Sequence, residues 1–284
     1  MGRGVLSGVL VAALALIALA PAALAQSSPD PNAKPENKPE MKEGCPGLVA
    51  TDELRPIPAA LRLAALASDQ VRLTYVGHAT FLIESPDLVR IATDYNDYVR
   101  SPLLPDIVTM NHAHSTHFSN HPDPAIKYVL RGWRDDGGPA NHDVTLRDVR
   151  VRSVATNIRD WGGGTERNGN SIFVFEIAGL CIAHLGHLHH TLTQQQLDDI
   201  GRIDVVMAPV DGNFTLDLDG MVEVLQSLKA RMIIPMHFFG TYTLERFLTR
   251  MGQDYGVDRN ETPSIVVSKA TLPDKPTVVV LPGH

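Results

Sequence analysis

Short apolar runs that end abruptly in glycine, proline or polar residues recur along the chain from residue 71 onward. Runs of about four to eight residues that are β-branched or alternate apolar with polar positions, bounded by such breakers, are typical of strands. The pattern predicts strands at 71–76, 79–84, 88–93, 106–110, 144–156, 171–177, 181–185, 204–209, 231–235, 264–268 and 276–281.

Helical patterns are fewer and lie mainly in the second half of the chain. They predict helices at 124–131, from Thr191 or Thr193 to about Ile200, at 219–228 and at 242–251, and an Ala/Leu-rich stretch, 59–67, predicts a short helix before the first strand. Strands predominate early and alternate with helices later. This order predicts a mixed α/β (α+β) sandwich with its loops gathered on one edge.

The first 25 residues have the pattern of a cleaved signal peptide. Arg3 precedes an apolar run from Val5 to Ala20, and Ala23-Leu24-Ala25 is a small-x-small cleavage signal. The run is short for a membrane span, so we expect export to the periplasm or outside the cell without a stable membrane anchor; a retained N-terminal anchor is the alternative. Residues 26–50, rich in proline and charge at first, predict a disordered leader before a single domain at 51–284.

Composition narrows the class of partner. The formal net charge is −7, and no basic patch with interleaved aromatic residues appears, so nucleic acid is a poor prospect and a small-molecule substrate fits better. In an oxidising compartment Cys45 and Cys181 could form a disulfide; alternatively Cys181 is a small core residue. The oligomeric state is not indicated by the sequence.

Histidines gather where predicted strands end. His112, His114 and His117 follow strand 106–110, while His187 and His237 follow strands 181–185 and 231–235. Neutral imidazole is the commonest metal ligand in proteins, and ligands at distant strand ends can meet at one edge of a fold. We therefore predict a metal site formed by these five residues; a His-rich surface loop is the alternative for the first three.

Several further residues are weaker candidates. His78 could lie near the site or be a buried structural residue, and His184 is expected to be structural because strand alternation turns it away from His187. Asp94 could support a ligand histidine or be a turn residue, and Asp211 could supply a carboxylate. The segment from Trp161 to Thr165 could overhang the site. We expect His189 and His190 to be either ligand supports or surface residues, and His121, His142 and His284 to lie at the surface.

The order of these motifs resembles the metallo-β-lactamase superfamily, most closely its lactonase and phospholipase-type branch. The likeness lies in Gly77-His78-Ala79-Thr80-Phe81, the His-x-His-x-x-His at 112–117, Gly186-His187, the strand 204–210 followed by Thr215, and Pro235-Met236-His237. It spans about residues 70–240. The resemblance implies an αββα sandwich with a metal site between loops at one edge of two sheets.

The chain departs from the family pattern at three ligand positions. Thr116 stands where the pattern has aspartate, His187 stands where a bridging aspartate is usual, and Asn157 lies near the position of a further histidine. Neutral imidazoles replace carboxylates, and an imidazole with one free lone pair cannot bridge two cations. We therefore expect one metal per chain rather than two: Zn is the first choice, with Cu, Fe or Ni as alternatives.

These residues lead to two functional hypotheses from different classes. The first is an exported hydrolase that uses a metal-bound hydroxide to attack an ester, lactone, amide or phosphoester, with His117 or His237 as general base. The second is a periplasmic Zn- or Cu-binding protein on the same fold, without hydrolysis. A degenerate member that binds no metal is a third and weaker interpretation, because four histidines of the pattern remain.

Overall fold

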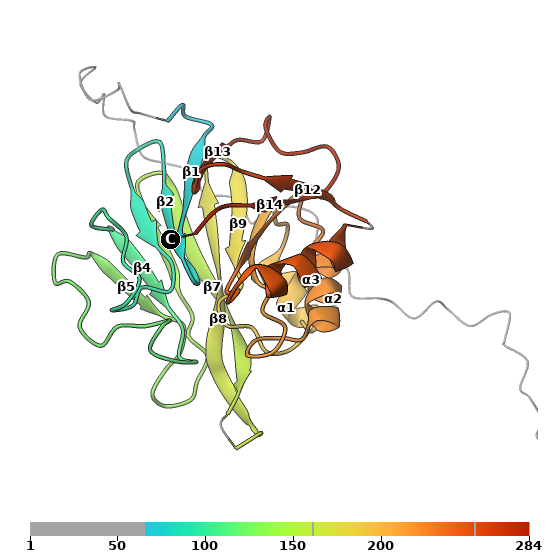
Figure 1. The fold of residues 1–284 in the computed structure, drawn as a ribbon. Coiled ribbons are helices and arrows are strands. Elements are labelled where there is room, and N and C mark those ends of the chain that lie inside the picture. Colours follow the sequence, from blue (N-terminus) through green and yellow to red (C-terminus); the bar gives the residue numbers. More distant parts are fainter. Residues whose placement is uncertain (1–65, 161, 253, 284) are drawn as a thin grey trace, which may run out of the picture. The chain divides into compact units, whose positions relative to one another are not determined.

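Two mixed sheets pack face to face, and three helices cover the outer face of one of them (Figure 1). This architecture is seen in a computed structural model that describes residues 66–160, 162–252 and 254–283. The predicted signal peptide, the leader and nearly all of the helix expected at 59–67 lie outside the described residues. Within them, no helix has the length and apolar character to cross a membrane.

The smaller sheet has six strands. Their order is β13 (Ser264–Val267), β1 (Val71–Gly77), β2 (Thr80–Glu84), β3 (Arg90–Ala92), β4 (Ile107–Met110) and β5 (Tyr128–Arg131). The larger sheet has eight strands, in the order β12 (Gly256–Arg259), β14 (Thr277–Val280), β11 (Met232–Met236), β10 (Val205–Pro209), β9 (Leu180–His184), β8 (Thr165–Ile177), β7 (Val149–Arg159) and β6 (Asp143–Leu146).

Side-chain alternation along the central strands separates two apolar layers. In β10, Val205 and Met207 face the other sheet, whereas Val206 and Ala208 pack toward the helices α1 (Gln194–Ile200), α2 (Leu218–Leu228) and α3 (Thr241–Met251). Because β10 is buried on both faces, its sequence is a continuous apolar run. The mixed two-sheet sandwich expected from the sequence is confirmed, and in the described residues its helices lie over the eight-stranded sheet.

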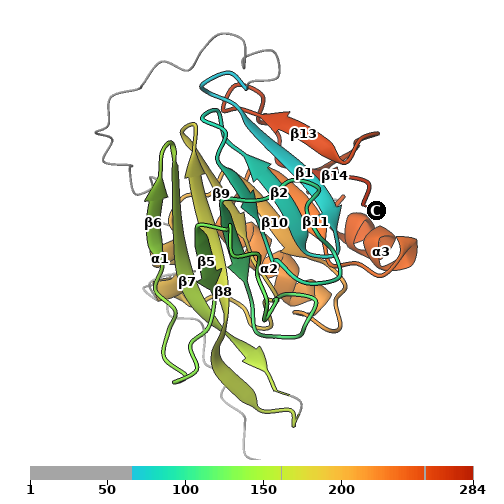
Figure 2. The ribbon, with the colours of Figure 1, turned by 90° about the vertical axis from the view of Figure 1, so that its left-hand side faces the viewer.

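Within each sheet, the strands that carry the candidate ligands run parallel to one another. β9, β10 and β11 are parallel neighbours in the larger sheet, and β3 and β4 are parallel in the smaller one. Their carboxyl ends therefore reach a common edge within each sheet. Figure 2, in which the six-stranded sheet faces the viewer, shows the two sheets superposed and the long arms of β7 and β8 extending beyond them.

Three predicted elements differ from the structure, which also contains one strand that the pattern did not predict. The helix expected at 124–131 is wrong: its second half is strand β5, which pairs in parallel with β4. The strand expected at 144–156 is the hairpin of β6 and β7, which turns at Arg147 with a positive φ of 52°. Strand β8 begins at Thr165 rather than at 171, and β12 was not predicted. The N-cap is Thr193, which forms a capping box with Gln196.

Cys181 is buried in β9 and is not a free thiol. Cys45, the other half of the predicted disulfide, lies outside the described residues.

Candidate metal centre

Four histidines and two aspartates reach one site from the ends of five strands. Asp94 follows β3, His114 and His117 follow β4, His187 follows β9, Asp211 follows β10 and His237 follows β11. Each residue lies between one and seven residues after the end of its strand, so the sheets anchor the loops that carry the site. A fifth histidine, His78, joins them from the tight turn between β1 and β2.

The backbone at the site is unusual at several of these residues. His78, Asp94 and His237 have φ values of 53°, 42° and 54°, in the left-handed region that side-chain-bearing residues rarely adopt. Gly186, with a φ of 61°, precedes His187, and a Cβ there would lie 2.4 Å from side-chain atoms of Asn111 and Asn170. Glycine is required at that turn because only it allows this approach.

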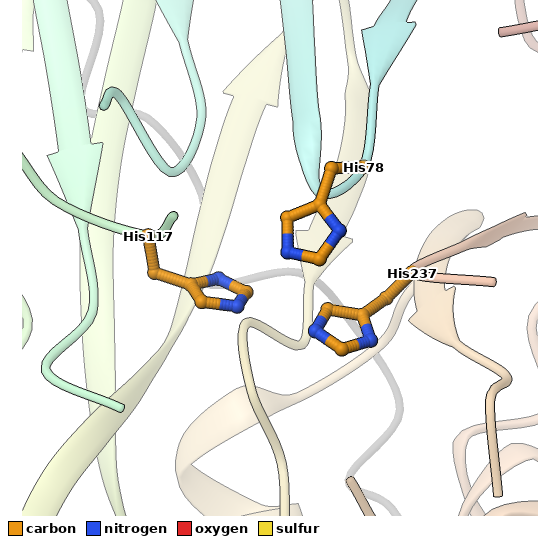
Figure 3. Close-up of side chains that lie close together, drawn as sticks. All are labelled: His78, His117 and His237. Carbon is orange, nitrogen blue, oxygen red and sulfur yellow. The ribbon is translucent and has the colours of Figure 1, made fainter. Parts of the chain in front are cut away.

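The imidazoles form two overlapping groups. His114, His117 and His187 make one group, and His78, His117 and His237 make the other; within each, one potential ligand atom per residue lies within 4.8 Å of the others. Figure 3 shows the second group, with the three rings turned toward a common centre. His117 belongs to both groups, and its ring lies nearly parallel to that of His237, with the ring centroids 5.2 Å apart.

Each of the three most buried rings has a partner at Nδ1: a carboxylate that accepts from His117 and from His237, and for His187 another imidazole, His189, whose own Nδ1 accepts from the Arg159 N–H. His117 Nδ1 lies 2.6 Å from Asp94 Oδ2, His237 Nδ1 lies 3.0 Å from Asp211 Oδ1, and His187 Nδ1 lies 2.8 Å from His189 Nε2. Within the described part of the chain, the Nε2 atom of each of the three is buried without a hydrogen-bond partner. Buried polar atoms are rarely left unpaired, so three such nitrogens in one cluster fit a metal ion that they would coordinate.

Burial disfavours the charged form of four histidines of the centre, His78, His114, His117 and His187. It depresses the pKa of His117 and of His187 well below 6.5, and the neighbouring histidines add to the effect. The pKa of His114 is lowered for the same reasons, and that of His78 falls to about 3. A neutral imidazole has a lone pair for a metal, whereas an imidazolium has none.

The two aspartates support histidines. Asp94 is fully buried, which raises its pKa to about 6, and its Oδ1 accepts a hydrogen bond from Asn111 Nδ2 at 2.9 Å. Burial would also raise the pKa of Asp211, but hydrogen bonds from His237 and Thr215 hold it well below its usual range. Each carboxylate bonds the Nδ1 side of a histidine, and neither belongs to the two groups around the centre. Of the two alternatives left open for Asp94, the structure shows the one in which it supports a histidine, and Asp211 has a similar position.

His112 is not brought together with the other four predicted ligands. Its Nδ1 lies 2.7 Å from Glu166 Oε1, and its side chain is 41% exposed. Its ring stacks on Trp133 with the centroids 5.0 Å apart. The residues that hold His112 come from β8 and from the loop after β5, and no local pattern indicates these contacts.

Thr116 and Asn157, which like His187 depart from the family pattern, also have hydrogen-bond partners. The Thr116 hydroxyl oxygen lies 3.1 Å from His78 Nε2 and 3.2 Å from His114 Nδ1. Asn157 sits where the β7–β8 register shifts, and its Oδ1 accepts a hydrogen bond from the backbone N–H of Asn168. Asn157 is therefore tied across the hairpin, and it belongs to neither group of histidines.

The other histidines divide into supporting and peripheral residues. His184 is fully buried in β9 and bonds the carbonyl of Ala79 at 2.8 Å, which is the structural role expected. His189 supports His187, while His190 is half-buried with its Nε2 unpartnered in the described structure. His121 is exposed and His142 bonds the Arg131 carbonyl; His284 lies outside the described residues.

Exposed aromatic side chains border the centre. Phe214 and Phe239 are 58% and 60% exposed, and their ring centroids lie 5.5 Å apart. The ring of Phe239 is 5.2 Å from that of His237.

The Gly162–Gly164 segment closes the β7–β8 hairpin around Asp160. The contact between this hairpin and His112 is made by Glu166 of β8.

The fold and the site together define a two-sheet protein with a histidine-rich metal centre at the ends of its strands. The family model described as the beta-lactamase superfamily domain matches residues 72–237, which is more than half of the chain, and the chain belongs to this superfamily. The matched segment begins in β1 and ends at His237, so it contains all the residues of both histidine groups.

Relatives of known name agree with this assignment. The chain is 25% identical over 192 residues to a UPF0173 metal-dependent hydrolase of Salinibacter ruber, covering 58% of this chain and 84% of that protein. A protein of the same name from Methanoculleus marisnigri is 25% identical over 182 residues, covering 59% of this chain and 81% of the relative.

Among solved structures, a protein of the metallo-beta-lactamase superfamily from Thermotoga maritima, named as a candidate Zn-dependent hydrolase, is 28% identical. The alignment covers 75% of this chain and all of that one, with a TM-score of 0.55. CmlA, a diiron beta-hydroxylase from Streptomyces venezuelae, shares the fold at 9% identity and a TM-score of 0.50, covering 72% of this chain and 55% of its own. The fold alone therefore does not determine the reaction.

Proposed function

We propose that the protein is an exported metal-dependent hydrolase that acts on a small molecule with an ester, lactone, amide or phosphoester bond. One observation carries the proposal: the unpartnered, buried Nε2 atoms of His117, His187 and His237 gather beside His114. The names of the relatives support metal-dependent hydrolysis as the class of reaction. The substrate is proposed from chemistry alone.

We propose a single metal ion per chain, with Zn²⁺ as the first choice. His117 has one nitrogen left after its hydrogen bond to Asp94, so it cannot complete both histidine groups at once. In the described residues both groups consist of imidazoles alone, and imidazole suits Zn, Cu, Fe and Ni. The candidate Zn-dependent hydrolase among the structural relatives favours zinc.

The two aspartates near the centre orient the ligand histidines. Asp94 and Asp211 hold the Nδ1 protons of His117 and His237, which turns the Nε2 lone pairs toward the metal. Both nitrogens of each ring are then occupied, so we propose these two residues as ligands and not as the general base. A bound divalent cation would polarise the scissile carbonyl or phosphoryl group and lower the pKa of a coordinated water from about 15.7 to about 7.

Export remains part of the proposal. It rests on Arg3, the apolar run 5–20 and the Ala23-Leu24-Ala25 signal. Expression of the full chain in a bacterial host, followed by fractionation and N-terminal sequencing, tests it. A mature protein that begins at Gln26 in the periplasmic or secreted fraction is expected, whereas a chain that keeps residues 1–25 in the cytoplasm would contradict it.

The second hypothesis, a Zn- or Cu-binding protein without turnover, has one observation in its favour. A dinuclear hydrolase needs carboxylates to neutralise its cations, and the two groups around this centre contain none among the described residues. Equilibrium metal binding combined with a screen of esters, lactones, amides and phosphoesters separates the two hypotheses.

The same experiment tests the proposed hydrolase. We expect about one Zn²⁺ per chain by elemental analysis, hydrolysis of at least one substrate class, and loss of both metal and activity in His237→Ala. His121→Ala, at an exposed histidine outside the centre, is the matched control and should resemble the wild type. Tight metal binding without turnover on any class would favour the binding protein.

A further inference from the structure

Three consecutive carbonyl oxygens of the loop after β10 meet one nitrogen atom. Arg159 Nη2 donates hydrogen bonds to the carbonyls of Asn213, Phe214 and Thr215, at 2.9, 3.1 and 2.7 Å. Arg159 is the last residue of β7, on the arm that extends beyond the two sheets (Figure 2). A side chain from that arm therefore holds a loop that follows a different strand.

The opposite side of the same loop is held by Asp211. Its Oδ2 accepts hydrogen bonds from the backbone N–H groups of Asn213, Phe214 and Thr215, at 3.0, 2.5 and 3.3 Å. The two peptide units that follow Asn213 and Phe214 thus have the C=O toward the guanidinium and the N–H toward the carboxylate. Each peptide unit is a dipole with its negative end at the oxygen, so this orientation is favourable at both ends.

Asp211 in turn orients a candidate ligand of the metal. Its Oδ1 accepts hydrogen bonds from His237 Nδ1 at 3.0 Å and from the Thr215 hydroxyl at 2.5 Å. The guanidinium of Arg159 is exposed, whereas Asp211 is buried. A cation in direct contact with Asp211 would repel a metal ion at the centre, and a solvated cation on the far side of the loop repels it less.

Two backbone contacts tie the same region to the loop that carries His187. The N–H of Arg159 donates to Nδ1 of His189, whose Nε2 lies 2.8 Å from His187 Nδ1. The N–H of Leu216, next to the held carbonyls, donates to the Leu188 carbonyl at 2.8 Å. The loops after β9 and β10 are thus linked to each other and to the end of β7.

We propose that Arg159 is a positioning residue of the metal centre: its guanidinium fixes the loop at 213–215 and, through Asp211, the orientation of His237. The proposal rests on the metal centre of the proposed function but not on hydrolysis. Three carbonyls that lose their donor would leave the loop held from one side only, and the carboxylate that the loop carries would lose its fixed position opposite His237.

The first test examines His237 in the absence of metal. Long-range ¹H–¹⁵N NMR of histidine-labelled protein reports the proton on His237 Nδ1, and the same proton on His117, which Asp94 holds, is the internal reference. We expect Arg159→Met to shift the His237 signal and to leave that of His117 in place. An unchanged His237 signal, or equal shifts at both histidines, would overturn the proposal.

The second test measures metal binding. Arg159→Met removes the guanidinium but keeps an unbranched stem, and Arg159→Lys keeps a cation with three N–H donors. Arg167→Met, at an exposed arginine on β8 of the same hairpin, is the matched control. Co²⁺ affinity is measured by competition with a chelator, the ligand field by the visible spectrum of the Co²⁺ form, and folding by circular dichroism.

We expect Arg159→Met to weaken Co²⁺ binding by about tenfold, at the lower end of the effect of groups that orient ligands, and to change the Co²⁺ spectrum. Arg159→Lys should recover most of the affinity, and Arg167→Met should resemble the wild type. Wild-type affinity and spectrum in folded Arg159→Met, or an equal loss in Arg167→Met, would overturn the proposal. Co²⁺ binding with the expected effects but no hydrolysis would support it and contradict only the proposed hydrolase function.

Discussion

Asp94 and Asp211 perform the same task in different surroundings. Asp94 is enclosed by protein, and burial raises its pKa to about 6, whereas Asp211 is held ionised by hydrogen bonds from its own loop and from His237. A carboxylate opposite Nδ1 directs the Nε2 lone pair of a histidine to the metal. Because Asp94 pairs with the histidine shared by both groups, its loss should affect the whole centre.

We predict that Asp94→Asn weakens Zn²⁺ binding by about 10–100-fold. If the amide nitrogen of the new side chain faces His117, it favours the tautomer of His117 that has its proton on Nε2. If the amide oxygen faces His117 instead, the amide nitrogen faces Asn111 Nδ2, which is also a donor. Chelator competition measures the affinity. Asp143→Asn, which removes an exposed carboxylate paired with Arg150, is the control, and equal affinities in the two variants would refute the assignment of Asp94.

His184 gives a prediction on pH and stability. Burial lowers its pKa below 6.5, and its ring is fixed by the Ala79 carbonyl and the Gly186 N–H. A histidine whose folded-state pKa is depressed takes up its proton more readily when unfolded. Its contribution to the free energy of unfolding is therefore complete above pH 6.5 and is lost as the pH falls from there toward the folded-state pKa.

We expect His184→Gln to reduce the acid sensitivity of the metal-free protein. The wild type should lose up to about 1.4 kcal/mol more stability per pH unit below pH 6.5 than the variant, which is the effect of one proton. Urea unfolding of the metal-free proteins between about pH 5 and pH 8 measures it. His142→Gln, at a partly exposed histidine, is the control variant. A slope in His184→Gln as steep as that of the wild type would show that folding does not lower the pKa of His184.

At the scale of elements, the sequence predicted the strand ends, which depend on local pattern. It missed the features that depend on pairing between distant strands. Strand ends located His114, His117, His187 and His237 because a buried run followed by histidine is visible in the sequence. The segment 128–131 reads as helix, yet pairing with β4 makes it strand β5. His112 was grouped with the other ligands because the register that brings Glu166 of β8 to it has no local signature.

The loops after β10 and β11 supply the exposed aromatic pair beside the centre. Phe239 touches the ring of His237 and Phe214 packs against Phe239, so an apolar group on a bound substrate would meet both rings. We predict that the double variant Phe214→Ser/Phe239→Ser raises KM for aryl or long-chain esters by about tenfold, with little change for acetyl esters. Tyr242→Ser, at another exposed aromatic residue, is the control. Equal effects on short and long substrates would exclude an apolar subsite here.

At the scale of the whole molecule, the centre joins the two sheets. His78, His114 and His117 come from loops of the six-stranded sheet, whereas His187 and His237 come from the eight-stranded sheet. Both groups of histidines contain residues from both sheets. A metal ion held by either group would therefore link the two halves of the sandwich, in addition to the apolar layer between them.

Removal of the metal should in consequence destabilise the fold as well as the site. A ligand present at 100 times its dissociation constant adds about 2.7 kcal/mol to the stability of the state that binds it. For a domain of this size each kcal/mol corresponds to about 2–4 °C in Tm, so chelation should lower Tm by at least about 5 °C. Calorimetry of the Zn²⁺-loaded and chelator-treated proteins measures the shift.

His187→Ala and His117→Ala should both lose most of this shift, because each deletes a ligand that one sheet contributes, and His121→Ala should keep it. The comparison separates a cross-link from a metal held by one sheet. An intact shift in His187→Ala beside a lost shift in His117→Ala would exclude the group of His114, His117 and His187 as the site, and if His237→Ala also kept the shift, the metal would be held by the six-stranded sheet alone. Equal losses in the two variants are expected from the geometry, since His117 and His187 lie in one group with their ring centroids 4.7 Å apart.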